Sequence, residues 1–362
     1  MLSKISLCLL LSLGLGLSGC NQFNRQVTPP GAAAEQNWFE TLNARRNDTP
    51  NPDVPEEWRK VVNSTVYVTP TGSTSFGSGF VIHPDGYVIT NRHVVMDEDE
   101  TELEVSFDQG EVTYKAELVS LNQCDDLALL RIKNTRQHTF PFVTFGPRIK
   151  LGEEVWLAGY PGDREQVVLS QGVVAQIARK EIQELLGPAD IFAANERLGS
   201  GSSGGPMFNA EQEVVGVSYA IDPRGSFEDQ YAVRSQTLLE VLPSMLERKF
   251  VRGWGFEYDY AARDSIPVNN VYPDSPAAEL GLQAGDKITK IEGIFFADKA
   301  GQRYCQAMRT DNGDTRSLEV TVERDDQTYV GTIYEEELTM RETQPTPTSE
   351  SDSEELPPNP FE

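Results

Sequence analysis

The chain has 362 residues, more than one hydrophobic core usually organises, and this length predicts a domain of roughly 200 residues with a smaller one beside it. Its hydrophobic fraction of 38% suits a soluble globular protein. The 56 acidic residues against 31 Lys and Arg residues give a formal net charge of −25, which repels phosphate backbones and argues against nucleic acid as a partner.

Residues 1–19 predict a secretory signal peptide. Lys4 precedes an apolar run of about a dozen residues, which is too short to span a bilayer. The run ends in Leu17-Ser18-Gly19-Cys20, and small residues before a cysteine are similar to the bacterial lipobox. Cys20 is therefore predicted to carry a lipid; the alternative is a plain signal peptide with an incidental cysteine. Residues 20–53 are rich in Pro, Gly, Ala, Asn and Gln and predict a flexible tether.

Two cysteines remain once Cys8 is removed with the signal and Cys20 is acylated, namely Cys124 and Cys305. They are far apart in the sequence, and we expect them in different domains. No histidine or Gly-rich turn near Cys124 would activate its thiol, so we predict a free buried thiol without chemistry. The sequence predicts no disulfide scaffold.

Residues 54–249 are predicted to form a mainly β domain. A short helix is expected at residues 55–62. Strand signals separated by Gly, Pro and Asp turns follow at residues 65–69, 77–83, 87–91, 103–107, 112–118, 127–132, 154–158, 166–178 and 214–220. This spacing is expected of Greek-key barrels and fits two six-stranded barrels.

The remainder of the chain changes character. A helix is expected at residues 236–249, with an apolar face made of Leu238, Leu239, Val241, Leu242, Met245 and Leu246. Residues 250–335 predict a compact α+β domain. Residues 336–362 are rich in acids and prolines, which predicts a disordered acidic tail.

Three histidines are candidates for the general base that a serine acyl-transfer enzyme usually needs. His83 lies in a turn and His138 in a polar stretch. His93 follows the strand at residues 87–91, and a strand end on a rigid scaffold can aim a side chain. A histidine at a strand end is more often structural, so the choice of His93 depends on the residues that accompany it.

The run Gly199-Ser200-Gly201-Ser202-Ser203-Gly204-Gly205-Pro206 has the form of a nucleophile loop. A glycine two positions before Ser203 lets its N–H turn toward a developing oxyanion, with the N–H of Ser203 as the second donor. The two glycines after Ser203 permit a tight bend. The alternative is a flexible linker, but the apolar strand that follows is untypical of linkers. Ser203 is the predicted nucleophile, because Ser200 and Ser202 lack this frame.

A carboxylate should fix the tautomer of His93, and it should lie between the base and the nucleophile in the chain. Asp126 fits because it abuts the apolar strand at residues 127–132. Asp125 is the rival. Since neighbouring residues in a strand face opposite sides, only one of the two acids can point at His93, and we prefer Asp126.

Four segments, residues 77–82, 85–95, 126–128 and 201–206, are similar to those of HtrA/Deg proteases, and the resemblance covers most of residues 54–335. It implies a chymotrypsin-like double six-stranded β-barrel followed by a small α+β PDZ domain. It also implies a triad of His93, Asp126 and Ser203, with an oxyanion hole formed by Gly201 and Ser203. The chain departs from the family at Arg92, Ser200, Ser202 and residues 194–197. These departures concern the regulatory loops and the specificity pocket.

The family alignment implies a primary pocket near Leu198 and a substrate strand near Val217, Ser218 and Tyr219. Arg197 stands six positions before the nucleophile, where trypsin has an acid that attracts Lys or Arg. Cleavage after basic residues is therefore not expected. Cuts after small aliphatic residues are predicted, and Arg197 leaves a preference for acidic residues open.

Residues 252–334 are similar to a PDZ domain, through the segments 252–256, 271–278 and 281–286. The loop Gly253, Trp254, Gly255 and Phe256 is predicted to bind the terminal carboxylate of a peptide, with the following strand as an edge for β-augmentation. For residues 275–286 a structural role in turns and core is favoured over binding.

The sequence thus predicts a serine endopeptidase of the cell envelope that needs no cofactor or metal. The family implies unfolded or damaged proteins as substrates, C-terminal peptides as PDZ ligands and a homotrimer. A lipid on Cys20 would hold it at a membrane facing the periplasm, with the outer membrane preferred because Asn21 is not the Asp that retains enteric lipoproteins at the inner membrane. The alternative is a catalytically silent adaptor or chaperone, which would be supported by the departure of residues 195–202 from the family pattern. A cysteine or metal hydrolase is disfavoured because the three histidines have no ligand spacing.

Overall fold

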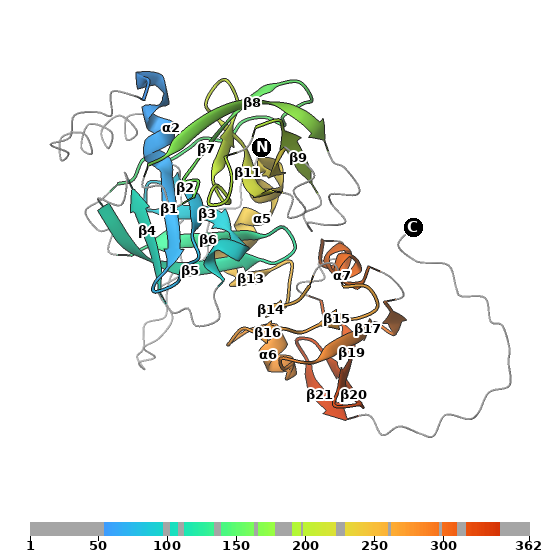
Figure 1. Cartoon of the computed structure of the whole chain (residues 1–362). Coiled ribbons are helices and arrows are strands. Elements are labelled where there is room, and N and C mark those ends of the chain that lie inside the picture. Colours follow the sequence, from blue (N-terminus) through green and yellow to red (C-terminus); the bar gives the residue numbers. More distant parts are fainter. Residues whose placement is uncertain are drawn as a thin grey trace, which may run out of the picture.

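The structure, a computed structural model, describes residues 54–96, 102–107, 112–133, 139–162, 166–177, 190–196, 198–221, 229–259, 262–296, 299–309 and 316–340. It contains a larger body of two β-barrels and a smaller α+β body, joined through strand β13 (Figure 1). The predicted fold class, mainly β with two six-stranded barrels, is confirmed.

The first barrel is entered through two short helices, η1 (Glu56–Trp58) and α2 (Arg59–Ser64). Its strands are β1 (Thr65–Pro70), β2 (Gly77–His83), β3 (Tyr87–Asn91), β4 (Leu103–Phe107), β5 (Val112–Asn122) and β6 (Leu127–Ile132). The order is β5-β4-β1-β2-β3-β6, and pairing of β5 with β6 closes the ring. Branched residues such as Val66, Val81 and Leu130 fill it because alternate residues of each strand face inward.

The register of β3 against β6 determines where the predicted base and acid emerge. Asn91 lies opposite Leu127 in this antiparallel pair. Helix α3 (Arg92–Val95) begins where β3 ends, and Asp126 directly precedes β6. His93 and Asp126 therefore leave the same edge of the barrel.

The second barrel closes in the order β10-β11-β12-β9-β8-β7. Its strands are β7 (Glu154–Gly159), β8 (Val168–Ile177), β9 (Ile191–Ala194), β10 (Pro206–Phe208), β11 (Val214–Ile221) and β12 (Gln230–Arg234). Strand β10 starts three residues after Ser203, so the nucleophile loop is anchored directly in the barrel. The sequence did not predict β9, β10 or β12.

Helix α5 (Ser235–Glu247) follows the second barrel and packs on β5 and β11. Leu238, Val241 and Met245 are buried, as their spacing of three and four residues requires. The prediction that Leu239 and Leu246 belong to the same buried face is wrong, since they are 41% and 43% exposed.

The smaller body begins at β13 (Phe250–Val251), which pairs in parallel with the end of β5. Strand β14 (Phe256–Glu257) pairs with β16 (Asn270–Val271), and a second sheet has the order β15-β17-β19-β20-β21 with β18 beside β17. The remaining elements are β15 (Ile266–Pro267), α6 (Pro276–Leu280), β17 (Lys287–Ile291), β18 (Ile294–Phe295), α7 (Ala300–Arg309), β19 (Glu319–Arg324), β20 (Gln327–Thr332) and β21 (Glu336–Met340).

Residues 275–286 have structural roles in this body. The Ser275 side chain caps α6 by accepting a 3.1 Å hydrogen bond from the N–H of Ala278. Buried Asp286 forms a bidentate ion pair with Arg324, with N–O distances of 2.6 and 2.8 Å. These contacts agree with the structural reading of this segment.

The predicted start of the acidic tail at residue 336 is wrong, because Glu336–Met340 form β21 and pair with β20. The other domain boundaries stay predictions, and residues 1–53 and 341–362 lie outside the described residues. Among the helices that the structure describes, none is long and apolar enough to cross a membrane.

Candidate active site

His93 and Asp126 form a hydrogen-bonded pair between α3 and β6. The imidazole Nδ1 lies 2.5 Å from Oδ2 of Asp126, and the backbone N–H of His93 donates to Oδ1 at 3.0 Å. The His93 side chain is 45% exposed whereas that of Asp126 is 9% exposed. A buried carboxylate therefore orients an accessible imidazole, which leaves Nε2 available for proton transfer.

The backbone of Asp126 is held as tightly as its side chain. Its φ of +53° is in the left-handed region, and its carbonyl accepts hydrogen bonds from the N–H of Arg92 and from Nδ2 of Asn91, both at 3.0 Å. The guanidinium of Arg92 adds an ion pair with Oδ1 at 3.7 Å. Burial acts most strongly and lowers the pKa of Arg92, but Asp126 together with Tyr272, Tyr258 and Glu257 outweighs it and raises that pKa, so Arg92 stays charged.

Asp125 points away from His93 and is fully buried. It accepts hydrogen bonds from Asn122 at 3.0 Å, from Arg252 at 2.8 Å and from Arg309 at 3.1 Å. Burial tends to raise the pKa of Asp125, but the two arginines hold it below its usual range. Of the two acids weighed in the sequence, the structure places Asp126 against His93.

The nucleophile loop requires glycine at its tightest points. A Cβ on Gly204, whose φ is +84°, would lie 2.2 Å from the carbonyl oxygen of Ser78. A Cβ on Gly201, whose φ is +93°, would lie 2.4 Å from the carbonyl oxygen of Tyr160. Ser78 supports the loop, because its hydroxyl donates to the Gly201 carbonyl at 2.7 Å and its N–H donates to the Ser203 carbonyl at 2.8 Å.

The Ser203 hydroxyl donates a 2.9 Å hydrogen bond to the carbonyl of Tyr219. The Tyr219 ring in turn meets the His93 ring edge-on, with centroids 6.1 Å apart. Ser203 and His93 thus share a neighbour, but the described hydrogen bonds include none between them. Within the described residues, the N–H groups of Gly201 and Ser203 donate to no other group, and both are available to an oxyanion.

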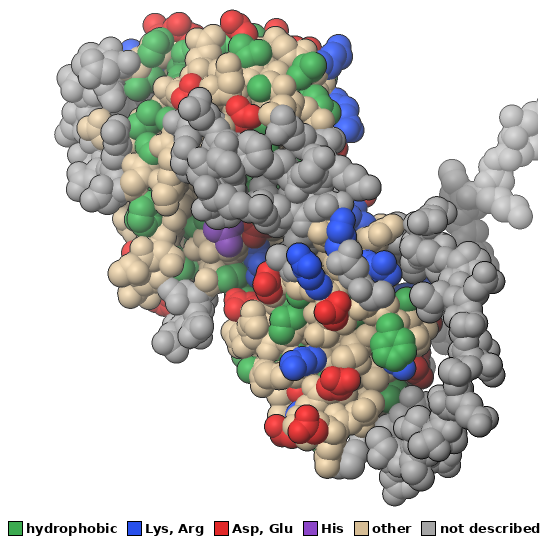
Figure 2. All heavy atoms as spheres, turned by 45° about the vertical axis from the view of Figure 1, so that its right-hand side comes forward, with side chains coloured by type: hydrophobic (Ala, Val, Ile, Leu, Met, Phe, Trp, Pro, Cys, Tyr) green, Lys and Arg blue, Asp and Glu red, His purple; other side chains and the backbone are tan. Residues whose placement is uncertain are grey.

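Figure 2 shows a histidine side chain at the surface, in the recess where the two bodies meet. His83 is the last residue of β2, where its Nδ1 accepts a hydrogen bond from the N–H of Asp85 and burial lowers its pKa. His138 lies outside the described residues.

The predicted pocket residues have different surroundings. Leu198 packs against the core of the second barrel, and the side chains of Val217 and Ser218 are fully buried. The backbone of Ser218 is bonded to Gly204 and Gly205, so of the predicted substrate strand Tyr219 is the most accessible part. Arg197, which bears on the cleavage preference, lies outside the described residues.

The loop predicted to bind a peptide carboxylate faces the larger body. Trp254 and Phe256 are fully buried, and Gly255 has a φ of +78°. The carbonyls of Gly255 and Glu257 accept hydrogen bonds from the N–H groups of Tyr272 and Asn269, on the side of β14 that faces β16. The Phe256 carbonyl therefore points to the other edge of β14. There it accepts a 2.5 Å hydrogen bond from Nε2 of Gln123, a residue of the turn between β5 and β6. A peptide that pairs at this position has to displace Gln123.

Two family profiles match the chain: the trypsin-like peptidase domain over residues 77–217 and the PDZ domain over residues 268–322. The chain is 28% identical over 231 residues to the serine endoprotease DegS of Haemophilus influenzae, covering 61% of this chain and 66% of DegS. It is 32% identical over 289 residues to a probable periplasmic serine endoprotease, DegP-like, of Pseudomonas putida, covering 71% of this chain and 58% of that protein. The chain belongs to the HtrA family of serine proteases.

Among solved structures, the HtrA-type protease AlgW with tripeptide is similar to this family member with a TM-score of 0.50 and 25% identity, covering 80% of this chain and 97% of AlgW. The chain spans between 45% and 66% of the length of the first curated relatives that it matches.

This HtrA-family chain contains a disulfide that the sequence analysis missed. Cys124, in the β5–β6 turn, is bonded to Cys305 of α7 with an S–S distance of 2.00 Å. The predictions of a free Cys124 thiol and of no disulfide are therefore wrong. They rested on a sequence separation of 181 residues, but β13 pairs beside β5 and brings the smaller body onto this turn. An even number of cysteines in a chain with a secretory signal was the available clue.

Proposed function

We propose that this protein is a serine endopeptidase in which Ser203 attacks a peptide carbonyl, His93 transfers the proton and Asp126 orients His93. The observation that carries the proposal is the buried Asp126 carboxylate, 2.5 Å from Nδ1 of an exposed His93. A pair arranged in this way stabilises the imidazolium that forms when Nε2 accepts the serine proton.

The Ser203 hydroxyl must leave the Tyr219 carbonyl before it reacts, because that bond holds the proton that His93 has to remove. A rotation about the Cα–Cβ bond of Ser203 would turn Oγ toward Nε2. The tetrahedral oxyanion would then be held by the N–H groups of Gly201 and Ser203. Leu198 and Tyr219 are the residues that we place in the substrate pocket, with the backbone at residues 217–219 alongside the substrate strand.

The substrates that we propose are unfolded or damaged polypeptides, and the loop at residues 253–256 is proposed to bind their C-termini. The PDZ profile supports this, as does the name of the similar AlgW structure, which contains a tripeptide. The relatives named periplasmic support a place in the cell envelope, and the Cys124–Cys305 disulfide suits an oxidising compartment.

Cleavage of an unfolded protein tests this function. Purified protein should degrade denatured casein without added nucleotide or metal, and Ser203→Ala should reduce the rate by roughly 10³-fold or more, as loss of a triad nucleophile does. Ser200→Ala is the matched control and should keep most of the activity. Equal rates for wild type and Ser203→Ala would refute the proposal.

A silent adaptor or chaperone is the second candidate, and the bond from Ser203 to Tyr219 in place of His93 favours it. An adaptor would suppress aggregation of an unfolded protein equally well in the wild type and in Ser203→Ala, with no cleavage products in either. The endopeptidase proposal predicts fragments from the wild type alone.

Lipid attachment at Cys20, retention at the outer membrane and a homotrimeric state are further proposals. Their support is the lipobox-like sequence and the family resemblance. Mass spectrometry of the mature N-terminus should detect a diacylglycerol adduct that Cys20→Ser abolishes. Light scattering of protein lacking residues 1–20 should give three times the chain mass.

A further inference from the structure

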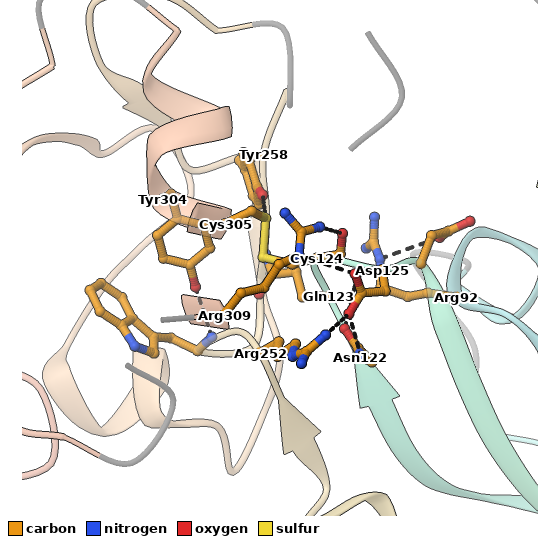
Figure 3. The surroundings of a disulfide bond; sticks show 12 residues. Arg92, Asn122, Gln123, Cys124, Asp125, Arg252, Tyr258, Tyr304, Cys305 and Arg309 are labelled. Carbon is orange, nitrogen blue, oxygen red and sulfur yellow. Dashed lines mark hydrogen bonds and ion pairs between the residues drawn. A yellow bond between two sulfur atoms is a disulfide. The ribbon is translucent and has the colours of Figure 1, made fainter. Parts of the chain in front are cut away.

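Asp125 is a buried charge whose partners come from two parts of the chain. From the first barrel, Asn122 donates to Oδ2 at 3.0 Å and accepts from the N–H of Asp125 at 3.0 Å. From the smaller body, Arg252 donates to Oδ2 and Arg309 donates to Oδ1. Figure 3 shows both guanidinium groups pointing at the carboxylate, with Asn122 below it.

The smaller body also holds the backbone of this turn. Arg309 donates from Nη2 to the carbonyl of Cys124 at 2.5 Å, and Cys124 is bonded to Cys305. Cys305 and Arg309 lie four residues apart on α7, which places them on one face of the helix. The disulfide therefore fixes the helix turn that brings Arg309 to Asp125 (Figure 3).

The orientation of Asp125 constrains that of Asp126. A buried carboxylate without its partners is strongly unfavourable, so the turn is stable only in a conformation that keeps Asp125 between the arginines. The next residue, Asp126, has a φ of +53° and points to the other side, toward His93. A change in the turn that releases Asp125 would also move the carboxylate that orients the base.

We propose that Asp125 is a positioning residue for the peptidase reaction. Its ion pairs with Arg252 and Arg309 fix the turn that aims Asp126 at His93, so the smaller body is a structural part of the active site. The disulfide between Cys124 and Cys305 keeps Arg309 in place. This inference rests on the proposed endopeptidase function.

Steady-state cleavage of denatured casein and the rate of fluorophosphonate labelling of Ser203 test the proposal on the full chain. Asp125→Asn and Arg309→Gln should each lower kcat and the labelling rate by roughly 10-fold to 100-fold, with KM changed less than about 2-fold, because a misplaced base slows the chemical step. Arg309→Lys should recover part of the loss, since a lysine still provides a charge. The double variant Cys124→Ser with Cys305→Ser should show a smaller loss of the same kind.

Arg324→Gln is the matched control, because it breaks an arginine pair with a buried acid in the same body without contact to the turn. It should keep kcat and the labelling rate of the wild type. The proposal is overturned if Asp125→Asn and Arg309→Gln keep both rates, or if Arg324→Gln loses as much as Arg309→Gln. If Asp125→Asn does not fold, the kcat and labelling rates of Arg309→Gln, Arg309→Lys and the double cysteine variant test the proposal in its place. A wild type that is not labelled at all counts against the endopeptidase function itself.

Discussion

At the scale of single residues, the site depends on glycines whose neighbours leave no room for a side chain. Gly204 packs against the Ser78 carbonyl and the Thr90 hydroxyl, with a Cβ position 2.2 and 2.4 Å from their oxygens. Gly72 has the same φ of +84° but nothing within 4 Å of its Cβ position. A substitution at Gly72 therefore tests only the left-handed backbone conformation, whereas a substitution at Gly204 tests that conformation and a steric clash together.

Gly204→Ala should be destabilised by more than Gly72→Ala and should lose activity. Alanine at position 72 should lower the free energy of unfolding only by the cost of the left-handed backbone conformation, about 1–2 kcal/mol. Alanine at Gly204 must in addition push Ser78 or the nucleophile loop aside. Thermal unfolding and casein cleavage measure both effects. Equal stability and activity of the two variants would show that the loop is not packed as described.

The buried charge of Asp125 predicts a pH dependence of stability. Its pKa is lowered in the folded protein, so its contribution is fully present above the unfolded value of about 3.9 and is lost as pH falls through the lower folded value. Asp125→Asn should lower the free energy of unfolding by about 3–5 kcal/mol at pH 7, because it removes the fully buried charge that pairs with the partly buried Arg252 and Arg309. The difference from wild type should shrink below about pH 4. Urea unfolding from pH 7 to pH 3 measures it, and a difference independent of pH would contradict this account.

The sequence predicted an acid, a base and a nucleophile, but it gave no role to Asp125. Alternation along a strand separates Asp125 from Asp126, and the apolar run beside Asp126 favoured it. The partners of Asp125 are arginines 127 and 184 positions away. No local pattern indicates contacts at such a distance.

At the scale of elements, alternating apolar residues identified strands well and short segments poorly. The bounds predicted for 77–83, 87–91, 103–107 and 127–132 agree with β2, β3, β4 and β6. Strands β9 and β10 were missed because they have four and three residues, too few for a clear period. Strand β12 was missed because all five of its residues are buried, including polar Gln230 and Arg234 at its ends, so it has no apolar–polar alternation. β10 is fixed by pairing on both edges, with β7 and β11, which is a tertiary effect.

The contact between Gln123 and β14 predicts how peptide binding responds to a mutation. Gln123→Ala should tighten binding of a C-terminal peptide, because the peptide then does not have to displace the Gln123 side chain from the Phe256 carbonyl. Loss of one hydrogen bond corresponds to about 0.5–1.5 kcal/mol, or up to about tenfold in Kd. Fluorescence anisotropy with a labelled hydrophobic C-terminal peptide measures it, with Gln302→Ala on α7 as the control. Weaker binding in Gln123→Ala would mean that Gln123 belongs to the peptide site.

At the scale of the whole molecule, the link between the two bodies is the feature that the sequence predicted least. Composition and motifs separated them, yet the disulfide, the parallel pairing of β13 with β5 and the pair of arginines on Asp125 all join them at one turn. That turn carries Asp126 and also contacts the PDZ loop through Gln123. The proposed catalytic and peptide-binding elements are thus connected through residues 122–126.

The most direct test of the central claim is labelling by a fluorophosphonate, which reacts with a serine only when a base and an oxyanion hole activate it. The full chain should be labelled on Ser203, as located by mass spectrometry. Ser203→Ala should abolish the label, and His93→Ala should slow it by orders of magnitude. A wild type that remains unlabelled with and without C-terminal peptides, or a label that persists in Ser203→Ala, would contradict the account.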